Sequence, residues 1–392
     1  MPLRAPRRHA IVSNVSAPRS PSVGASSGAD VAREPDAVDP PGPVPHHGHS
    51  QPSLSLRWRA DEISRLVSRS TLRDGDELVV VGSDSLVVSP MVDLELSRDS
   101  RPFRYGATPY VLPSQHATWK ELAVDHFRRS KKVIFDGPCV RLESEPRLPG
   151  ALAFRTVGYF DTLATDFIAQ YDIVSTSTSS VLHQGSSLVF DCHGRLRDLE
   201  GSWAGNSVGV STVAISSDGA LVLIDQGGGN VSSPGLVAPS GSGSASPDDF
   251  VEAPDSQTAL TRGMERELRE ECNLTERSTG LQMATRLTGF ARWLDHGGKP
   301  EFYGVTWMDI DAEQLRSTGV SNSERPLVDV VRTTDINLRA LRDAAGDLQV
   351  IARGMPERSS VPLLMCVRAL SLLLVREPDA IESLRRVALS MA

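Results

Sequence analysis

The segment from Ser256 to Leu274 constrains the fold of this 392-residue chain more than any other part of the sequence. Its apolar side chains recur every four residues, which is typical of a helix that buries one face against a core. The opposite face of this helix is acidic. We therefore expect it to lie with one side on a sheet and the other toward a polar site. The apolar residues are Leu260, Met264, Leu268 and Cys272.

Three carboxylates are concentrated on just over one turn of the acidic face. Glu267 and Glu271 are like charges at positions i and i+4, an arrangement that costs a few tenths of a kcal/mol in a solvated helix. Glu270 lies a third of a turn away. Carboxylates are preferred ligands of Mg²⁺, and a bound cation removes the repulsion. The cluster predicts a divalent-metal site, while a solvated helix with exposed ion pairs is the alternative that the motif alone leaves open.

The residues from Arg266 to Glu271 spell R-E-L-R-E-E, which resembles the core of the Nudix box, R-E-U-x-E-E, where U is aliphatic. The resemblance implies a metal-dependent pyrophosphohydrolase. In that family the glutamates that match Glu267, Glu270 and Glu271 bind metal, and the one that matches Glu267 also serves as base. The arginine that matches Arg266 orients a glutamate. We therefore expect Mg²⁺, with Mn²⁺ as an alternative, and the catalytic residues Glu267, Glu271 and Arg266.

The amino half of the box departs from the pattern. The glutamate that holds the arginine in the family falls on Thr258 here, and the first glycine of the box falls on Glu252. Because Thr258 cannot form that ion pair, we expect an acid from the rebuilt loop to replace the glutamate. The candidates are Glu252, Asp255, Asp248 and Asp249.

Two further positions concern the backbone of the helix. Asn273 stands where the box has glycine, and Asn is the next best residue at adopting the left-handed conformation in which helices commonly end. Gly263 lies inside the helix, where glycine costs about 1 kcal/mol relative to alanine. We expect another backbone segment to approach the helix at Gly263.

The helix lies between two pairs of predicted strands. A hairpin is predicted at 207–215 and 221–224, and a second pair at 287–293 and 300–308, because β-branched and aromatic residues alternate around turn residues. Residues 359–392 supply one or two closing helices. Together with the resemblance, this order predicts an α/β (α+β) fold, a Nudix-type mixed-sheet α/β/α sandwich.

The amino-terminal half divides into a tail and an extension. Residues 1–55 are rich in Pro, Ser, Ala and Gly and have no hydrophobic period, so we expect a disordered tail. We assign no site to the histidines of this tail. The expected organisation is the tail 1–55, an amino-terminal α/β extension 56–200 and a Nudix domain 201–392. Within the extension, helices are predicted at 56–67, 116–129 and 159–168, and strands at 77–82, 133–142 and 151–157.

Several segments outside the box resemble, in their order, the Nudix pyrophosphatases of animals and plants that cleave UDP-sugars. The resemblance implies that a UDP-sugar is hydrolysed to UMP and a sugar 1-phosphate, and that the extension helps to build the nucleotide-sugar pocket. The chain departs from these relatives at 226–229, where they have arginines, and at 239–243, where they have a Pro-Gly-Gly-His type of loop. The matching segments are 135–142, 157–166, 207–210, 231–241, 287–292 and 300–303.

The substrate contacts are expected among a few arginines, tyrosines and one glutamate. Arginines are candidates for phosphate contacts and tyrosines for stacking on a base, although solubilising charge and ordinary packing are the alternatives for each. Glu301, near a strand end, is a candidate outer metal ligand or base. The predicted substrate-binding residues are Arg141, Tyr159, Arg292 and Glu301, with Arg262 and Tyr303 as further candidates.

Composition narrows the class of protein. A net charge of −8 gives no global attraction to nucleic acid or anionic membrane. The four cysteines lie far apart, which argues against a zinc site and a disulfide framework. The longest apolar run, 361–375, is interrupted by Arg368 and is shorter than the roughly 20 residues of a membrane span.

We therefore expect a cytoplasmic hydrolase that acts on a nucleotide-sugar, without nucleic-acid or membrane partners. The oligomeric state stays open. The alternative is a non-catalytic Nudix-like domain that binds a nucleotide-sugar or a protein partner.

Overall fold

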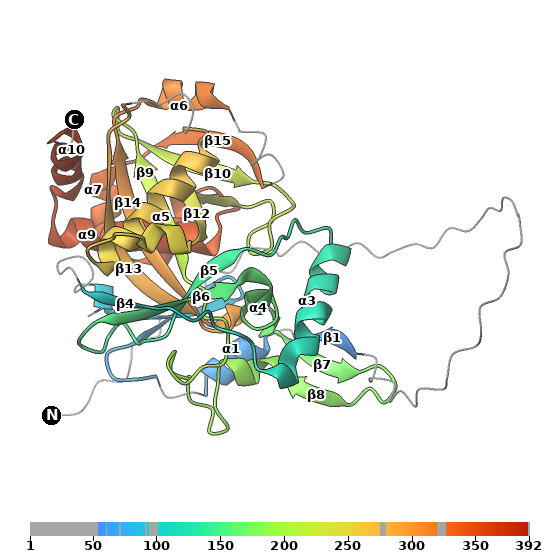
Figure 1. The fold of residues 1–392 in the computed structure, drawn as a ribbon. Coiled ribbons are helices and arrows are strands. Elements are labelled where there is room, and N and C mark those ends of the chain that lie inside the picture. The colour runs from blue at the N-terminus through green and yellow to red at the C-terminus, as the bar shows by residue number, and fades with distance from the viewer. Residues whose placement is uncertain are drawn as a thin grey trace, which may run out of the picture.

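The computed structural model describes residues 54–390, apart from 60, 70, 71, 91, 94–100, 275–279 and 320–326. The largest sheet has nine strands in the order β11-β10-β9-β14-β13-β3-β2, while β12 pairs with β9 and β15 with β10. Figure 1 labels β9, β10, β12, β13, β14 and β15 of this sheet. Strands β9 and β14 run parallel and the other pairs are antiparallel, so the sheet is mixed. The strands are β2 (Glu77–Val81), β3 (Asp84–Val88), β9 (Gly209–Ile215), β10 (Ala220–Gln226), β11 (Val237–Pro239), β12 (Gly241–Ser244), β13 (Met283–Trp293), β14 (Lys299–Met308) and β15 (Val328–Asp335).

Helices cover both faces of this sheet. Alternate side chains of β9 point to opposite faces. Val210 packs in the core with Met264 of α5 (Ser256–Glu271), whereas Val213 packs in the core to which α9 (Val361–Arg376) contributes. The layers are helix, sheet and helix, and the predicted α/β (α+β) fold class is confirmed. The remaining helices of this half are α6 (Ala312–Thr318) beside β15, and α7 (Leu338–Ala344), α8 (Leu348–Arg353) and α10 (Ala380–Ser390) on the α9 side.

The amino-terminal half contributes two three-stranded sheets, β1-β7-β8 and β4-β6-β5, and one hairpin of the large sheet. The β2–β3 hairpin joins the large sheet because β3 pairs with β13. The division at residue 200 stays a prediction, and the large sheet draws strands from both sides of it. The elements are β1 (Leu54–Trp58), α1 (Glu62–Val67), β4 (Phe103–Gly106), α3 (Ala117–Arg129), β5 (Pro138–Leu142), β6 (Leu152–Gly158), α4 (Tyr159–Leu163), β7 (Tyr171–Ser175) and β8 (Val181–Gln184).

The prediction for 56–67 is wrong at its start. Leu54–Trp58 forms strand β1, paired with β7 more than a hundred residues along the chain, and the helix spans only Glu62–Val67. Pairing with a distant strand overrides the local preference, and a sequence window cannot detect that partner. Most of the predicted tail, with His46, His47 and His49, lies outside the described residues.

Two other predicted elements are shorter in the structure. The strand predicted at 133–142 begins at Pro138, because the preceding residues follow a separate loop, with the N–H of Val133 donating to the carbonyl oxygen of Gly229 at 3.0 Å. The helix predicted at 159–168 ends at Leu163. The predicted strand pairs around the acidic helix and the closing helices are confirmed.

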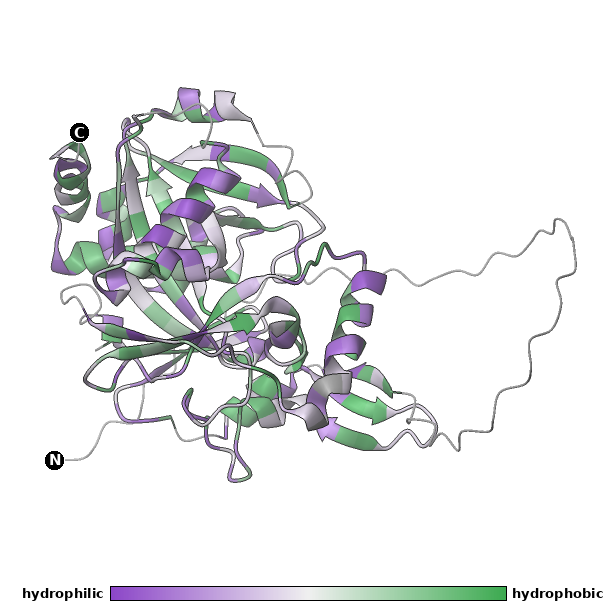
Figure 2. Ribbon diagram, viewed as in Figure 1, coloured by the Kyte–Doolittle hydropathy of each residue, from purple (hydrophilic) through white to green (hydrophobic). Residues whose placement is uncertain are grey.

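The apolar run at 361–375 forms the buried helix α9, as predicted. Among the helices of the described ranges, none reaches the length and apolarity that crossing a membrane requires. The four cysteines are free. Figure 2 shows polar residues along the outward side of α5, as the four-residue period of its apolar residues predicts.

Two glycines of β12 bring this strand against α5. A Cβ atom at Gly241 would lie 2.5 Å from the backbone nitrogen of Leu268, and one at Gly243 would lie 2.3 Å from the carboxyl carbon of Glu267. Real Cβ atoms do not approach backbone atoms so closely, so glycine is needed at position 241. A larger residue at position 243 would displace the carboxylate of Glu267. The strand therefore passes directly under the acidic turn of the helix.

Replacing Gly241 with alanine should separate α5 from β12. We expect the free energy of unfolding to fall by about 1–3 kcal/mol, because the new methyl group meets backbone that cannot rotate away. Urea denaturation followed by circular dichroism measures the change. Gly201→Ala is the matched control, since a Cβ at Gly201 meets no atom within 4 Å; equal stability of the two variants would contradict the close packing.

Candidate functional site

Helix α5 is fixed at both ends by its own sequence. The side chain of Asp255 accepts a hydrogen bond from the N–H of Thr258 at 2.7 Å, which caps the first turn. At the other end Asn273 has a φ of 53°, so the predicted left-handed residue after the helix is confirmed. Asp255 and Asn273 therefore define where helix α5 begins and ends.

Arg266 is held by Asp249 through two parallel hydrogen bonds. Its Nε lies 3.0 Å from one carboxylate oxygen and its Nη2 3.1 Å from the other. Nη2 also donates to the carbonyl oxygen of Ser244 at 3.0 Å. Of the four acids that the sequence offered as partner, Asp249 is the one in place, whereas Asp255 caps the helix and Glu252 is exposed.

Gly263 makes room for this ion pair. A Cβ atom at position 263 would lie 2.8 Å from a carboxylate oxygen of Asp249. We expected a backbone segment there, and the structure corrects this, since the close neighbour is a side chain. Asp249 is itself positioned by the N–H of Ser246, which donates to its carboxylate at 2.8 Å in a capping box.

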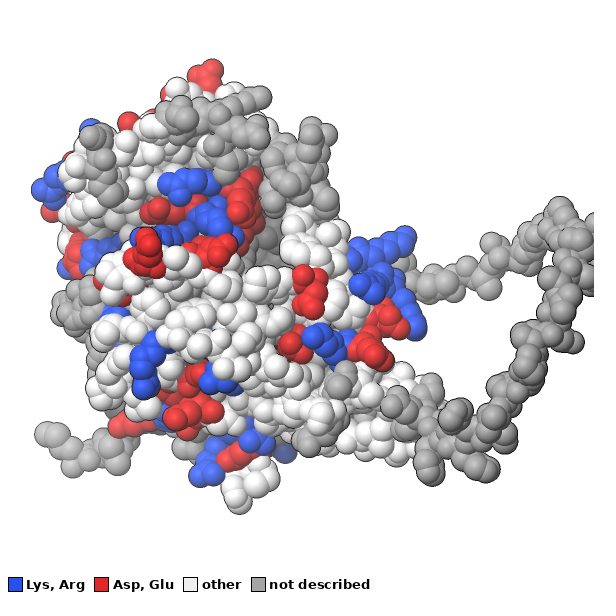
Figure 3. All heavy atoms as spheres, in the orientation of Figure 1, with Lys and Arg blue, Asp and Glu red and all other residues white. Residues whose placement is uncertain are grey.

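The three glutamates of the motif lie around the guanidinium of Arg266 and the edge of β12. Arg266 Nη1 donates to Glu267 at 2.8 Å and lies 3.4 Å from Glu270. Glu271 accepts a hydrogen bond from the N–H of Ser242 at 3.2 Å. Burial raises the pKa of Glu267 to about 7; Arg266 opposes this shift, and the charge of Glu270 adds to it. Figure 3 shows acidic and basic side chains gathered over this part of α5.

A cavity of about 420 Å³ opens beside the acidic turn, a volume in the range of small-molecule sites. Arg266 and the three glutamates line it, and so do the predicted residues Tyr159 and Glu301. The structure thus brings six of the predicted site residues to one cavity. Neutral and aromatic side chains form other parts of its wall, among them Phe135, Phe167, Gln226, Trp293 and His296.

The donor set fits a magnesium ion held partly by its substrate. In the described part of the chain, no three His, Cys, Asp or Glu side chains are already placed to hold a metal ion. Mg²⁺ usually keeps several waters and takes one or two carboxylates, with substrate phosphates completing its shell. Glu267, Glu270 and Glu271 line one cavity, and the absence of a side chain at Gly243 leaves the carboxylate of Glu267 unobstructed by β12. This arrangement fits that mode of binding rather than a closed protein cage.

Lys299 is a cavity residue that sequence reasoning missed. It is buried on β14, and its Nζ donates to the carboxylate of Glu301. A Cβ atom on Gly209 of the neighbouring strand would collide with that carboxylate, so glycine at position 209 leaves the space that the Glu301 side chain occupies. The signal was a lysine and a glutamate two apart on a strand, which places both on one face.

Arg141 and Arg292 lie away from this cavity. Arg141 is buried, donates to the carbonyl oxygen of Ser202 at 2.6 Å and stacks over the ring of Tyr110. Arg292 donates to the carbonyl oxygen of Gly298 at 3.0 Å. These arginines hold backbone segments together, and we leave them out of the candidate site. Of the further candidates, Arg262 bonds to the carbonyl oxygen of Val251, and Tyr303 is buried in the core with α9.

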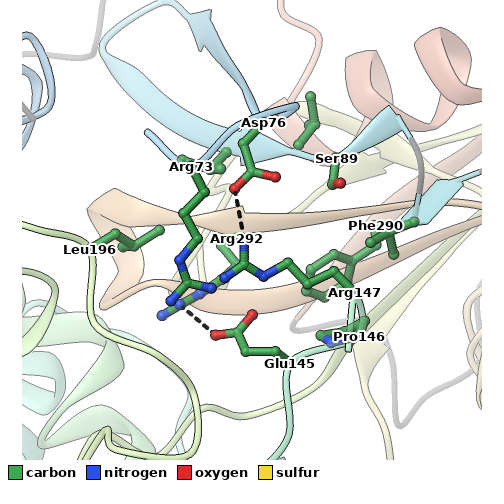
Figure 4. Close-up of a pocket in the computed structure, with 12 residues that line it drawn as sticks. Arg73, Asp76, Ser89, Glu145, Pro146, Arg147, Leu196, Phe290 and Arg292 are labelled. Atoms are coloured by element: carbon green, nitrogen blue, oxygen red, sulfur yellow. Dashed lines mark hydrogen bonds and ion pairs between the residues drawn. The ribbon is translucent and has the colours of Figure 1, made fainter. Parts of the chain in front are cut away.

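Arg292 lines a second, much smaller cavity of about 30 Å³ (Figure 4). Glu145 forms an ion pair with Arg292 at 3.4 Å, and Asp76 lies 3.7 Å from Arg147. The space is that of only a few water molecules. It is too small for a phosphate group together with the rest of a nucleotide.

Removing the carboxylate of Asp249 should loosen the acidic turn. We expect Asp249→Ala to lower the free energy of unfolding by about 2–4 kcal/mol, because Arg266 loses both bonds of a charge-assisted pair. Denaturant titration measures this. Glu252→Ala is the control and should change stability by less than about 0.5 kcal/mol, since Glu252 is exposed. A larger effect at Glu252 than at Asp249 would refute the assignment of the partner.

Comparison with known proteins gives little further constraint. No protein-family model matches the chain, and no curated protein matches it. Among solved structures, the chain is similar to the crystal structure of DR0079 from Deinococcus radiodurans, with 18% sequence identity over 41% of this chain and 81% of that one, and a TM-score of 0.26. At this TM-score the similarity carries no inference about fold or function.

Proposed function

We propose that the protein is a Nudix-type pyrophosphohydrolase that uses Mg²⁺ or Mn²⁺ to cleave a nucleoside diphosphate-linked compound, with a UDP-sugar as the substrate. The observation that carries this proposal is the meeting of Arg266, Glu267, Glu270 and Glu271 in one cavity of ligand size. The products are UMP and a sugar 1-phosphate. Water supplies one oxygen to one phosphorus, and the bond between that phosphorus and the bridging oxygen breaks. Both protons of the water are released as the two phosphate monoester products ionise to dianions.

Bound Mg²⁺ or Mn²⁺ neutralises phosphate charge and activates a water molecule. Glu267, Glu270 and Glu271 would hold it, because carboxylates are the oxygen donors that these ions prefer. The role of Arg266 is positional: its guanidinium is fixed by Asp249 and hydrogen-bonds Glu267 at 2.8 Å. Glu267 is therefore held in one orientation, and we assign it the acceptance of the proton from water.

Other groups of the cavity support phosphate binding. Lys299 brings a positive charge into the cavity, paired with Glu301. The backbone N–H groups of β12 lie close to the acidic turn, as the bond from Ser242 to Glu271 indicates. Lys299 and Glu301 are buried, and electrostatic interactions of buried groups are stronger than those in bulk water.

The rival function is a non-catalytic domain that binds a nucleotide-sugar or a protein partner. The rebuilt loop before α5 favours it, because the box is incomplete there. A binding domain gains thermal stability from the ligand alone, whereas the proposed hydrolase gains turnover only with metal. Product formation from UDP-glucose, measured with and without Mg²⁺ beside the thermal shift, separates the two, because a binding domain leaves the ligand intact.

Hydrolysis is tested with UDP-glucose and ADP-ribose, with Mg²⁺, with Mn²⁺ and with chelator. We expect UMP and glucose 1-phosphate from UDP-glucose only when metal is present. Running the reaction in ¹⁸O-water and locating the ¹⁸O in the products by mass spectrometry identifies the phosphorus that water attacks. Complete inertness of every substrate in a folded, metal-binding preparation would remove the enzyme proposal.

Glu271→Gln should abolish turnover without unfolding the protein. The expected loss exceeds the roughly 10- to 100-fold that outer-shell partners of a metal cost. The melting temperature should stay level or rise, since the change removes like-charge repulsion with Glu267 and keeps an acceptor for Ser242. Glu265→Gln on the same helix is the control and should leave turnover unchanged, because Glu265 does not line the cavity. Normal turnover of Glu271→Gln would contradict its role.

A further inference from the structure

Gln226 is the last residue of β10 and lines the cavity. It is 6% exposed, and its Oε1 atom has no hydrogen-bond partner among the residues that the structure describes. Asn230 in the same cavity differs, because its Nδ2 donates to the carbonyl oxygen of Leu327 at 2.6 Å. The carboxamide of Asn230 is therefore bonded within the protein, whereas the buried Oε1 of Gln226 is available to accept a hydrogen bond from a ligand. Buried polar atoms without a partner are rare and call for an explanation.

The backbone around Gln226 is held firmly. Its N–H donates to the carbonyl oxygen of Leu236 at 2.9 Å, and the N–H of Gly227 donates to that of Leu327 at 2.8 Å. Strand β10 pairs with β11 and with β15. The side chain of Gln226 is therefore attached to a rigid backbone, so a hydrogen bond from its carboxamide to a ligand costs little conformational entropy.

Flat rings line the same cavity. Trp293 and His296 stack with ring centres 3.9 Å apart at an angle of 8°, and Phe167 lies 5.0 Å from His296. The Trp293 Nε1 donates to Asp84 at 2.9 Å, which fixes the ring. Phe135 is 71% exposed although it lines the cavity. Aromatic rings and the carboxamide of Gln226 thus line one cavity, and such a lining favours a flat, polar-edged ligand group.

We propose that Gln226 hydrogen-bonds the base of the bound nucleotide and sets the base specificity of the cavity. The inference rests on the proposed function for the class of ligand. A carboxamide presents one acceptor and one donor side by side. Uracil offers the matching pair: Oε1 accepts from N3–H, and Nε2 donates to O4.

Gln226 is uncharged, and three glycines follow it. A neutral carboxamide attracts phosphate and metal less strongly than a charged side chain does, so it is suited to the uncharged part of the ligand.

The test is equilibrium binding of UDP-glucose and its N3-methyluracil analogue to the full chain with chelator present, so that turnover does not enter. Isothermal calorimetry compares the wild type with Gln226→Met, which has a similar shape and cannot accept or donate in this way. We expect N3-methylation to weaken wild-type binding about 5- to 100-fold. In Gln226→Met the two ligands should bind alike. Gln349→Met, an exposed glutamine on α8, is the matched control and should behave as wild type.

A second variant keeps an acceptor and removes the donor. Gln226→Glu should shift the ratio of CDP-glucose to UDP-glucose affinity toward cytosine by about 10-fold, because a carboxylate accepts from the cytosine amino group. A merely structural role of Gln226 would lower both affinities together. Circular dichroism and melting curves confirm that the variants are folded.

Three results would overturn the inference. The first is that N3-methylation weakens binding equally in the wild type and in Gln226→Met. The second is that the ratio of CDP-glucose to UDP-glucose affinity is unchanged in Gln226→Glu. The third is that UDP-glucose does not bind the wild type saturably. If the protein hydrolyses UDP-glucose with metal but the effect of N3-methylation does not depend on residue 226, the proposed function stands and the base contact is refuted. If that effect depends on residue 226 but no hydrolysis occurs, the base contact stands and the proposed function is refuted.

Discussion

The bidentate pair between Arg266 and Asp249 is the interaction on which the site depends. It ties the acidic turn of α5 to the short helical turn at Pro247–Phe250, and through Ser244 to strand β12. Two neighbouring residues make the pair possible. Gly263 leaves space for the carboxylate of Asp249, and the N–H of Ser246 donates a hydrogen bond to it. Without the pair, Glu267 would lose the neighbour that orients it, and like charges would face each other across one helical turn.

The sequence was sufficient for the parts of the site that are local in the chain. The period of four in α5 and the R-E-L-R-E-E spelling predict the helix, its buried face and the acidic turn, and the cap at Asn273 follows from backbone preference alone. The turn residues between β9 and β10 and between β13 and β14 likewise predict two antiparallel strand pairs. These features need only neighbours within one turn or one strand.

Long-range geometry was not available from the sequence. The partner of Arg266 could be narrowed to four acids but not chosen, because the choice depends on how the rebuilt loop folds over Gly263. Arg141 and Arg292 were selected for charge, and burial against backbone carbonyls removes them. Lys299 shares a face of β14 with Glu301, but it was passed over because the sequence does not show that this face borders the cavity. Strand β1 was missed for the same reason, since its partner is far along the chain.

The pairing of β3 with β13 has a consequence for how this protein can be divided. On the side of β13 that faces away from β14, Ala291, Arg292 and Trp293 pair with Val88, Val87 and Leu86 of β3. Asp84, at the start of β3, orients the Trp293 ring that borders the cavity. A fragment that keeps the acidic helix but lacks the amino-terminal hairpin would expose the end of an 11-residue strand as a free edge. Such edges recruit other strands, so the fragment would tend to aggregate while its cavity lost a wall. The site is therefore a property of the whole folded chain and not of the stretch that carries its glutamates.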